Sequence, residues 1–288
     1  MEIKCVKMKD LNIEEMYNLS FPLKPELYNE LREKFAPLPF IIINNAWKIV
    51  FGIDYYHFLN SQNVVYVDVL QIDTSDKEAL FLNFNLKEKM TGVNLFEKLV
   101  FLKRISRLAE TAEIYRKTNL EINVNSELME KFDLMLCNDF QVCLVEERIV
   151  LKTALKLCDF LPEDREVLLE LFSRVSFSSS FQLRILEMTE EILFRDKCLL
   201  SEVFNKLAVE RYMELEKPQK QIIDALFKFR NPIYLESESR WEEDIKRLNF
   251  PGNLKVTHFP FFEKKQLEVK LHLKDAEELK GLIKKLKS

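Results

Sequence analysis

The pattern of hydrophobic and polar positions changes character twice along the 288 residues, and roughly the first ninety residues mix strands with helices. Three runs rich in β-branched residues predict strands at 40–44 (FIIIN), 47–51 (WKIVF) and 64–72 (VVYVDVLQI). Only Asn45 and Ala46 separate the first two runs, and this spacing is typical of a tight hairpin. The third run alternates enough to be a strand with one partly wet face.

Gly52 ends the second predicted strand and is one of only four glycines in the chain. The residues after it, IDYYHFLN, predict one or two helical turns, so Gly52 stands at a strand-to-helix junction. A glycine there permits a positive φ or a close backbone approach that a side chain would block. Two further helices are predicted. One is an amphipathic helix at 22–35. The other begins at a capping box formed by Ser75 and Glu78 and ends at about Leu86.

From about Leu95 the β-rich runs disappear for some 120 residues, and apolar residues recur at spacings of three and four positions. This predicts one long helix at 95–117 and shorter helices at 126–136, 150–159, 164–174, 179–195 and 200–214. A third section begins near Lys217, with helices expected at 218–229, 237–249 and 275–287 and strands at 253–259 and 266–273. We therefore expect an α+β protein with a small mixed α/β domain at 1–92, an all-helical domain at 93–216 and a small α/β module at 217–288.

The composition indicates the general class of protein but does not indicate a binding partner. The net charge of −4 gives no global electrostatic argument for nucleic acid or for an anionic membrane. No apolar stretch is long enough to cross a bilayer and the amino terminus lacks a signal-peptide pattern, so we expect a cytoplasmic protein with no membrane partner. The five cysteines are scattered without a CxxC pair, which indicates buried thiols and neither disulfides nor a metal site.

Catalytic motifs are missing from the sequence. We find no phosphate-binding loop, no nucleophile with a matching base and no metal-ligand spacing. His57 stands among aromatic residues, where packing is the expected role. We therefore assign no catalytic residue.

The order of these elements resembles the amino-terminal domain of the ParB family of chromosome- and plasmid-partition proteins, which has a sulfiredoxin-like α/β fold. The matching segments are PELYNELREKF, PFIIINNAWKIVFG, IDYYHFLN, VVYVDVLQID, TSDKEALFLNF, NLKEKMTGVN and LFEKLVFLKRI. Residues 146–172 resemble more loosely the central DNA-binding domain of that family.

The resemblance implies a nucleotide site in which Gly52 and Asn85 match family positions, with CTP as the cofactor. The chain departs from the family motifs around both residues. Ile53, Asp54 and Tyr55 stand where the family has a glutamate and two arginines, and Glu88 stands for another arginine. Because carboxylates repel a triphosphate that arginines would neutralise, we expect CTP hydrolysis to be lost. The alternative role of Gly52 and Asn85 is a turn glycine and a loop asparagine.

DNA binding is the other property that the resemblance implies. Between Leu120 and Glu147 the sequence has seven acidic residues and only one basic residue, Lys131, so this stretch would repel the phosphates of DNA. Better candidates are a basic stretch of the helix at 95–117 and the start of the second helix of a helix-turn-helix-like pair at 164–195. They comprise Lys98, Lys103, Arg104, Arg107, Ser179, Gln182 and Arg184. We expect Arg104 and Arg184 to be exposed; a solvated helix face and ordinary helix capping are the alternatives.

Two functions remain open. One is a DNA-associated ParB-like protein of partition, nucleoid occlusion or transcription regulation, placed at the nucleoid, and it is slightly favoured. The other is a degenerate scaffold that keeps the fold and binds protein instead of DNA. Sixteen basic and eleven acidic residues follow Glu216, a net charge of +5, and this module is expected to form a homodimer.

Overall fold

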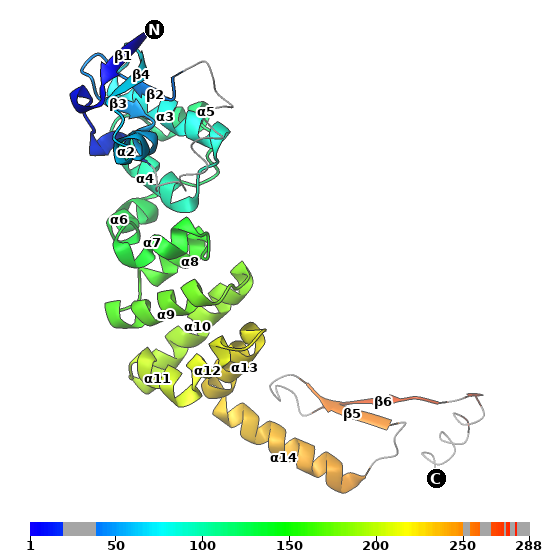
Figure 1. Cartoon of the computed structure of the whole chain (residues 1–288). Helices are drawn as coiled ribbons and strands as arrows, with labels where there is room; N and C mark the ends of the chain where they lie inside the picture. Colours follow the sequence, from blue (N-terminus) through cyan, green and yellow to red (C-terminus); the bar gives the residue numbers. More distant parts are fainter. Residues whose placement is uncertain (20–38, 250–253, 260–265, 274, 277–279, 281–288) are drawn as a thin grey trace.

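The computed structural model describes residues 1–19, 39–249, 254–259, 266–273, 275–276 and 280. The predicted helix at 22–35 and most of the one at 275–287 lie outside these residues. The described chain is elongated: a small sheet lies at one end, pairs of helices follow, and one long helix with a two-stranded hairpin lies at the other end (Figure 1). The mixed helix and sheet content confirms the α+β class.

The amino-terminal sheet has four strands in the order β1-β4-β2-β3. They are β1 (Glu2–Lys7), β2 (Ile41–Ile43), β3 (Ile49–Phe51) and β4 (Tyr66–Gln71). β4 pairs antiparallel with β1 and parallel with β2, and β2 and β3 form the predicted hairpin. The Asn44 side chain accepts hydrogen bonds from the backbone N–H groups of Ala46 and Lys48 and so closes the turn. Two short 3-10 helices, η1 (Met8–Asp10) and η2 (Glu15–Tyr17), follow β1.

Gly52 joins β3 to α2 (Ile53–Ser61) in the manner that its position predicts. Its φ is +87°, in the left-handed region, and an added Cβ would lie 2.6 Å from the carbonyl oxygen of Phe40. Both reasons for a glycine therefore apply at this junction, because a side chain meets backbone strain and a backbone atom together.

Replacement of Gly52 by alanine is expected to lower the free energy of unfolding by at least about 2 kcal/mol, since the new Cβ overlaps backbone that cannot swing away. Gly92 is the matched control: its φ is +79°, but nothing lies within 4 Å of an added Cβ. Gly92→Ala should cost only about 1 kcal/mol, from the dihedral strain alone. Urea unfolding of both variants measures the difference, and equal losses would contradict the close-approach argument.

Ten helices with described bounds continue the chain through the middle of the molecule. They are α3 (Asp76–Met90), α4 (Leu95–Ile105), α5 (Thr111–Lys117), α6 (Ser126–Met135), α7 (Asn138–Val145), α8 (Leu151–Leu157), α9 (Pro162–Arg174), α10 (Ser179–Asp196), α11 (Leu200–Leu207) and α12 (Val209–Met213). The Ser75 hydroxyl accepts the Glu78 N–H at the start of α3, which confirms that predicted cap.

Two predicted helices are divided in the structure. The helix expected at 95–117 breaks after Ile105, and α5 turns back along α3, where Glu113 pairs with Lys77 at 3.2 Å and Lys117 pairs with Glu78. The helix expected at 200–214 breaks at Ala208, whose φ is +52°. Tertiary contacts therefore override continuous helical spacing at the first break.

A continuous hydrophobic core runs from the sheet to α13 (Pro218–Arg230). The rings of Phe84 on α3 and Phe101 on α4 stack at 4.2 Å, so side chains pack directly across the predicted division near residue 92. α13 packs on α10 and buries Ile222 and Leu226 completely. Among the described residues, no helix has the length and apolar character needed to cross a membrane.

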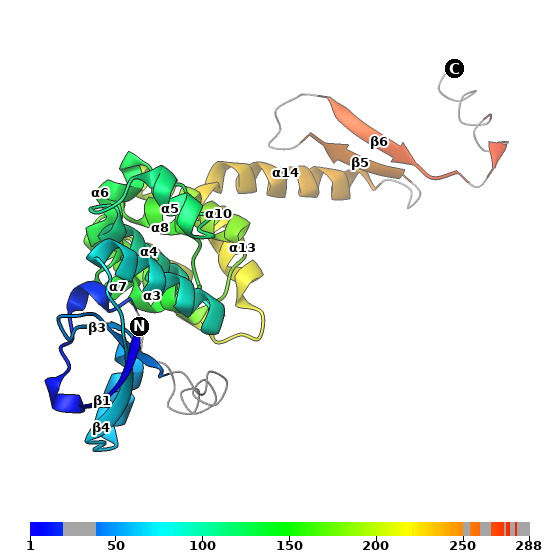
Figure 2. The same cartoon turned by 90° about the horizontal axis from the view of Figure 1, so that it is seen from above.

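The last described elements have little core of their own. α14 (Pro232–Leu248) buries no residue, and a hairpin of β5 (Leu254–His258) and β6 (Leu267–Leu271) lies beside it (Figures 1 and 2). His258 Nε2 lies 2.9 Å from the Glu238 carboxylate of α14, and its ring meets Trp241 edge-on at 5.4 Å. The hairpin is thus held to α14 by a polar contact and one aromatic pair.

Candidate functional site

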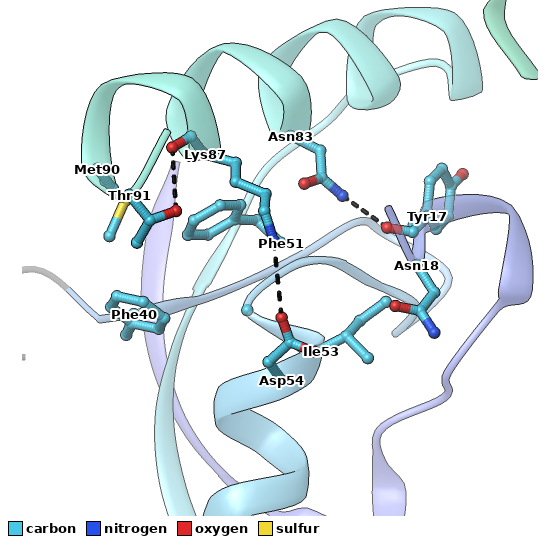
Figure 3. A pocket seen from close by; sticks show the side chains of 11 residues that line it. Tyr17, Asn18, Phe40, Phe51, Ile53, Asp54, Asn83, Lys87, Met90 and Thr91 are labelled. Carbon is cyan, nitrogen blue, oxygen red and sulfur yellow. Dashed lines mark hydrogen bonds and ion pairs between the residues drawn. The ribbon is translucent and has the colours of Figure 1, made fainter. Parts of the chain in front are cut away.

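A small cavity lies where β3, α2 and the carboxyl end of α3 meet, at the position to which the family resemblance assigns a nucleotide. Gly52 and Asp54 line it from the β3–α2 junction, Asn83 and Lys87 from α3, and Asn18 from the loop after η2 (Figure 3). Its volume is about 30 Å³. A cavity of this size has room for only a few water molecules.

Lys87 and Asp54, the charged residues that line this cavity, belong to an ion-pair group with Glu97 of α4. Lys87 Nζ lies 2.9 Å from a carboxylate oxygen of Glu97 and 4.0 Å from one of Asp54, and the Lys87 and Glu97 side chains are only 7% and 5% exposed. Glu97 also forms a capping box with Asn94 at the start of α4. The three side chains thus tie α2, α3 and α4 together with one positive and two negative groups.

Asn83, rather than Asn85, is the asparagine of α3 that lines the cavity. Its amide donates to the carbonyl oxygens of Tyr17 and Val50 at 2.7 and 2.8 Å. Asn85 donates to the carbonyl of Lys117 at 3.0 Å, against α5, and does not line the cavity. The structure therefore does not bring Gly52 and Asn85 together. Asn83 and Lys87 stand at i and i+4 on α3, and this spacing marks a shared helix face.

The basic candidates of α4 occupy different environments. Arg104 is mostly buried and donates to the carbonyl oxygens of Met16 and Asn18 and to Glu15. Burial lowers the pKa of its guanidinium, and the Glu15 carboxylate offsets part of this. The expectation that Arg104 is exposed is wrong, because this side chain fixes the segment after η2 to α4.

The other three cations of α4 and its end remain nearer the surface. Lys103 pairs with the exposed Asp133 of α6, and this contact lowers the pKa of the Asp133 carboxyl. Arg107 is exposed and Lys98 is half-buried. Lys103 and Arg107 line a groove of about 530 Å³ beside the segment after η2.

Gln182 is the side chain whose environment differs most from the DNA-binding prediction. It is 2% exposed and uses its full hydrogen-bonding capacity. Its oxygen accepts from the Val150 N–H and the Thr153 hydroxyl, and its nitrogen donates to the carbonyls of Arg148 and Phe177. Gln182 in this structure is a structural link between the loops around α8 and α10, and it presents no group to a base edge.

The remaining candidates lie near Gln182 on α10. Ser178 is the helix cap, its hydroxyl accepting the Phe181 N–H, and Ser179 is exposed at the first helical position. Arg184 is exposed as expected, with its guanidinium 5.9 Å from the centre of the Phe227 ring. α10 packs chiefly on α8 and α13, and α9 packs on α7 and α11, so α9 and α10 do not form a self-contained pair.

The cysteines offer no activated nucleophile among the thiols with a shifted pKa. Burial raises the pKa of both Cys143 and Cys158 to about 11, which keeps these thiols protonated near neutral pH. Cys5 is exposed, so the expectation that all five thiols are buried is wrong for this residue. No group of three or more metal-ligating side chains occurs among the described residues.

Comparison with known proteins finds likeness in solved structures only. No known family profile matches the chain, and no curated protein matches its sequence. A Pnob8-like ParB-N domain is 16% identical, with 81% of this chain and 96% of that chain covered and a TM-score of 0.41. The C-terminally truncated chromosome-partitioning protein ParB from Caulobacter crescentus, complexed with CTP-γ-S, is 16% identical, with 60% and 99% covered and a TM-score of 0.27. Both TM-scores lie below 0.5, so the arguments that follow rest on this chain's own residues.

Proposed function

We propose that this protein is a binding scaffold with ParB-like organisation that performs no nucleotide chemistry. The observation that carries the proposal is the cavity beside Gly52, which has a volume of about 30 Å³. Small-molecule sites commonly measure about 300–1,000 Å³. A nucleotide therefore has no room there, and the Asp54 carboxylate disfavours phosphate in the space that exists.

Titration of the full chain with magnesium and CTP or ATP is expected to give no binding heat and no phosphate release above background. The physical reason is that Lys87, the one cation among the described residues that line the cavity, is already held by two carboxylates of the same chain. Calorimetry and a phosphate assay make the measurement. Phosphate release that saturates with CTP and disappears in a folded Gly52→Trp variant would overturn the proposal.

Self-association is the second part of the proposal. Val256 and His258 of β5 pair directly with Val269 and Leu267 of β6, so these four residues share one face of the hairpin. On this face Leu267 and Val269 are 51% and 57% exposed. Two strands alone make a marginal sheet. Pairing of two hairpins would cover these side chains, and a symmetric dimer is the commonest assembly of this kind.

Sedimentation equilibrium is expected to find a dimer for the full chain and a monomer for a chain that ends at Asn231. This end point keeps α13, whose buried Ile222 and Leu226 belong to the core. A chain that ends at Glu216 would lose those contacts and is the poorer test. If the full chain is a monomer at tens of micromolar, or if the shortened chain is still a dimer, the hairpin is not the dimer contact.

DNA association is a second candidate function, and the net charge of +5 that follows Glu216 favours it. The exposed cations of α14, β5 and β6 are Arg240, Lys246, Arg247, Lys255 and Lys270, of which Arg240, Arg247 and Lys270 pair with nearby carboxylates. Non-specific binding through such side chains weakens linearly with the logarithm of salt concentration. Anisotropy titrations of a labelled duplex at several salt concentrations distinguish the candidates. DNA binding by the full chain that is lost in the chain ending at Asn231 favours this function, and absence of binding at low salt excludes it.

A further inference from the structure

A separate groove lies between the end of α8, the start of α9 and the last turns of α10, and is named here the α8–α10 groove. Its volume is about 360 Å³, within the usual range for ligand sites. Its apolar lining consists of Phe160, Leu161 and Leu193. Its charged lining consists of three acidic residues, Asp159, Asp164 and Glu190, and one basic residue, Lys156.

Two large apolar side chains at this groove are open to solvent. Leu161 lines the groove and is 63% exposed. Phe194 is 85% exposed and follows Glu190 by four positions on α10, so it lies on the helix face that carries this groove residue. Apolar side chains of this size that gather at a polar-rimmed groove are typical of an interaction surface.

Two of the three carboxylates already have partners in the chain. Asp164 is buried and accepts the backbone N–H of Leu200, so it belongs to the fold and not to a partner. Asp159 pairs with Lys131 of α6 at 2.7 Å, but its side chain is 64% exposed. An ion pair with so exposed a carboxylate contributes little stability, so a second cation can approach Asp159 at small cost.

The third carboxylate is the one that a partner can use. Glu190 is exposed, and the ion pairs found among the described residues do not include it. Lys156, the one basic residue of the lining, lies 3.7 Å from the carboxylate of Glu187 on the same face of α10. The groove therefore presents net negative charge beside exposed apolar side chains, and this combination favours a cationic partner with apolar residues.

We propose that the α8–α10 groove binds residues 281–288 of a second copy of the chain, with the sequence GLIKKLKS. These residues lie outside the described part of the structure. The segment has no acidic residue, and it combines three lysines with three large apolar residues: Lys284, Lys285 and Lys287, and Leu282, Ile283 and Leu286. This contact is separate from the hairpin pairing of the proposed function and goes beyond it.

The segment and the groove complement each other in two respects. The lysines supply positive charge where Glu190 and Asp159 are exposed, and the leucines and isoleucine would cover Leu161 and Phe194. Charge over the whole chain has the same asymmetry. The chain carries −4 and the part after Glu216 carries +5, so residues 1–216 carry −9 and attract a lysine-rich segment.

The position of the chain end indicates that a second copy supplies the segment. The last described residues lie beyond the hairpin, away from α8, α9 and α10 (Figures 1 and 2). A contact within one chain would need the α14 arm to swing back over the main body. A contact between two chains leaves each fold as described.

The test is fluorescence anisotropy of a fluorescein-labelled GLIKKLKS peptide added to the full chain. We expect saturable binding that Glu190→Lys weakens at least about tenfold, because the substitution reverses the charge that meets the lysines. Glu166→Lys is the matched control. Glu166 is an exposed carboxylate of α9 that does not line the groove, so this variant should bind within about twofold of wild type.

Apolar contact is tested from both sides of the interface. Phe194→Ser should weaken peptide binding at least about fivefold, and its fold should be retained because the side chain is so exposed. A peptide with Leu282, Ile283 and Leu286 replaced by serine should bind at least about tenfold weaker than GLIKKLKS. Circular dichroism of each variant confirms that the fold is unchanged.

Several outcomes overturn the proposal. Failure of GLIKKLKS to bind does so, as does full affinity in Glu190→Lys. Equal binding of the serine peptide, or an equal loss in Glu166→Lys and Glu190→Lys, shows non-specific charge attraction and rejects the groove as the site. Glu190→Lys keeps the hairpin and should remain a dimer in sedimentation equilibrium, so failure of this contact and failure of the hairpin contact can be distinguished.

Discussion

Replacement of Gln182 by leucine is expected to lower the free energy of unfolding by at least about 3 kcal/mol, because several buried polar groups lose their partners together. The backbone N–H of Val150 and the carbonyl oxygens of Arg148 and Phe177 all depend on this one amide. Leucine fills similar space, so the loss comes from hydrogen bonding more than from packing. Urea unfolding followed by circular dichroism provides the measurement.

Ser179→Ala is the matched control on the same helix. Ser179 is exposed and Ser178 supplies the cap, so this variant should stay within about 0.5 kcal/mol of the wild type. A base-reading role for Gln182 predicts the opposite pattern. In that case Gln182→Leu would keep its stability and lose only DNA affinity, and such a result would contradict the structural role described above.

Replacement of Lys87 by methionine should cost about 3–5 kcal/mol, the usual loss when one partner of a buried ion pair is removed. Glu97 and Asp54 would then lose the ammonium group that lies 2.9 and 4.0 Å from their carboxylate oxygens. Urea unfolding of the variant and of the wild type at pH 7 measures the loss.

A double variant, Lys87→Met with Glu97→Gln, checks the cause. Glutamine keeps the capping box with Asn94 because its side chain can still accept that backbone hydrogen bond. The double variant should therefore be more stable than Lys87→Met alone. If the two are equally unstable, the loss belongs to packing of the lysine stem and not to uncompensated charge. Lys98→Met on α4 controls for removal of a lysine elsewhere.

Local signals in the sequence predict much of the fold. The β-branched runs mark β2, β3 and β4, and the glycine, turn and capping residues mark their ends. β1 is missed because Glu2, Lys4 and Lys7 interrupt its apolar residues at a sheet edge, where only Val6 is buried. α7 is missed because its buried Phe140 and Leu144 span little more than one turn. Short elements like these form through contacts with distant residues, which a local pattern does not contain.

The candidate site is less predictable than the fold, and particular residues explain why. The helix from Ser75 is predicted to end near Leu86, so Lys87 is excluded from the face it shares with Asn83, although α3 continues to Met90. Gln182 and Arg104 have the side-chain types of DNA-binding residues, but the structure uses both for internal hydrogen bonds. The sequence shows the type of each side chain. Whether a polar side chain binds a partner or forms an internal hydrogen bond depends on which backbone groups the fold leaves unpaired.

α14 gives the molecule a spacer. Its 17 residues rise about 1.5 Å each and so extend roughly 25 Å from the end of α13 without burying a side chain in the main body. Figure 2 shows that this arm projects clear of the other helices. Two chains joined at their hairpins would therefore keep their main bodies apart. Each body would then raise the local concentration of whatever the other one holds. The geometry of a dimer of this kind suits bridging between separate partners better than enclosing a single one.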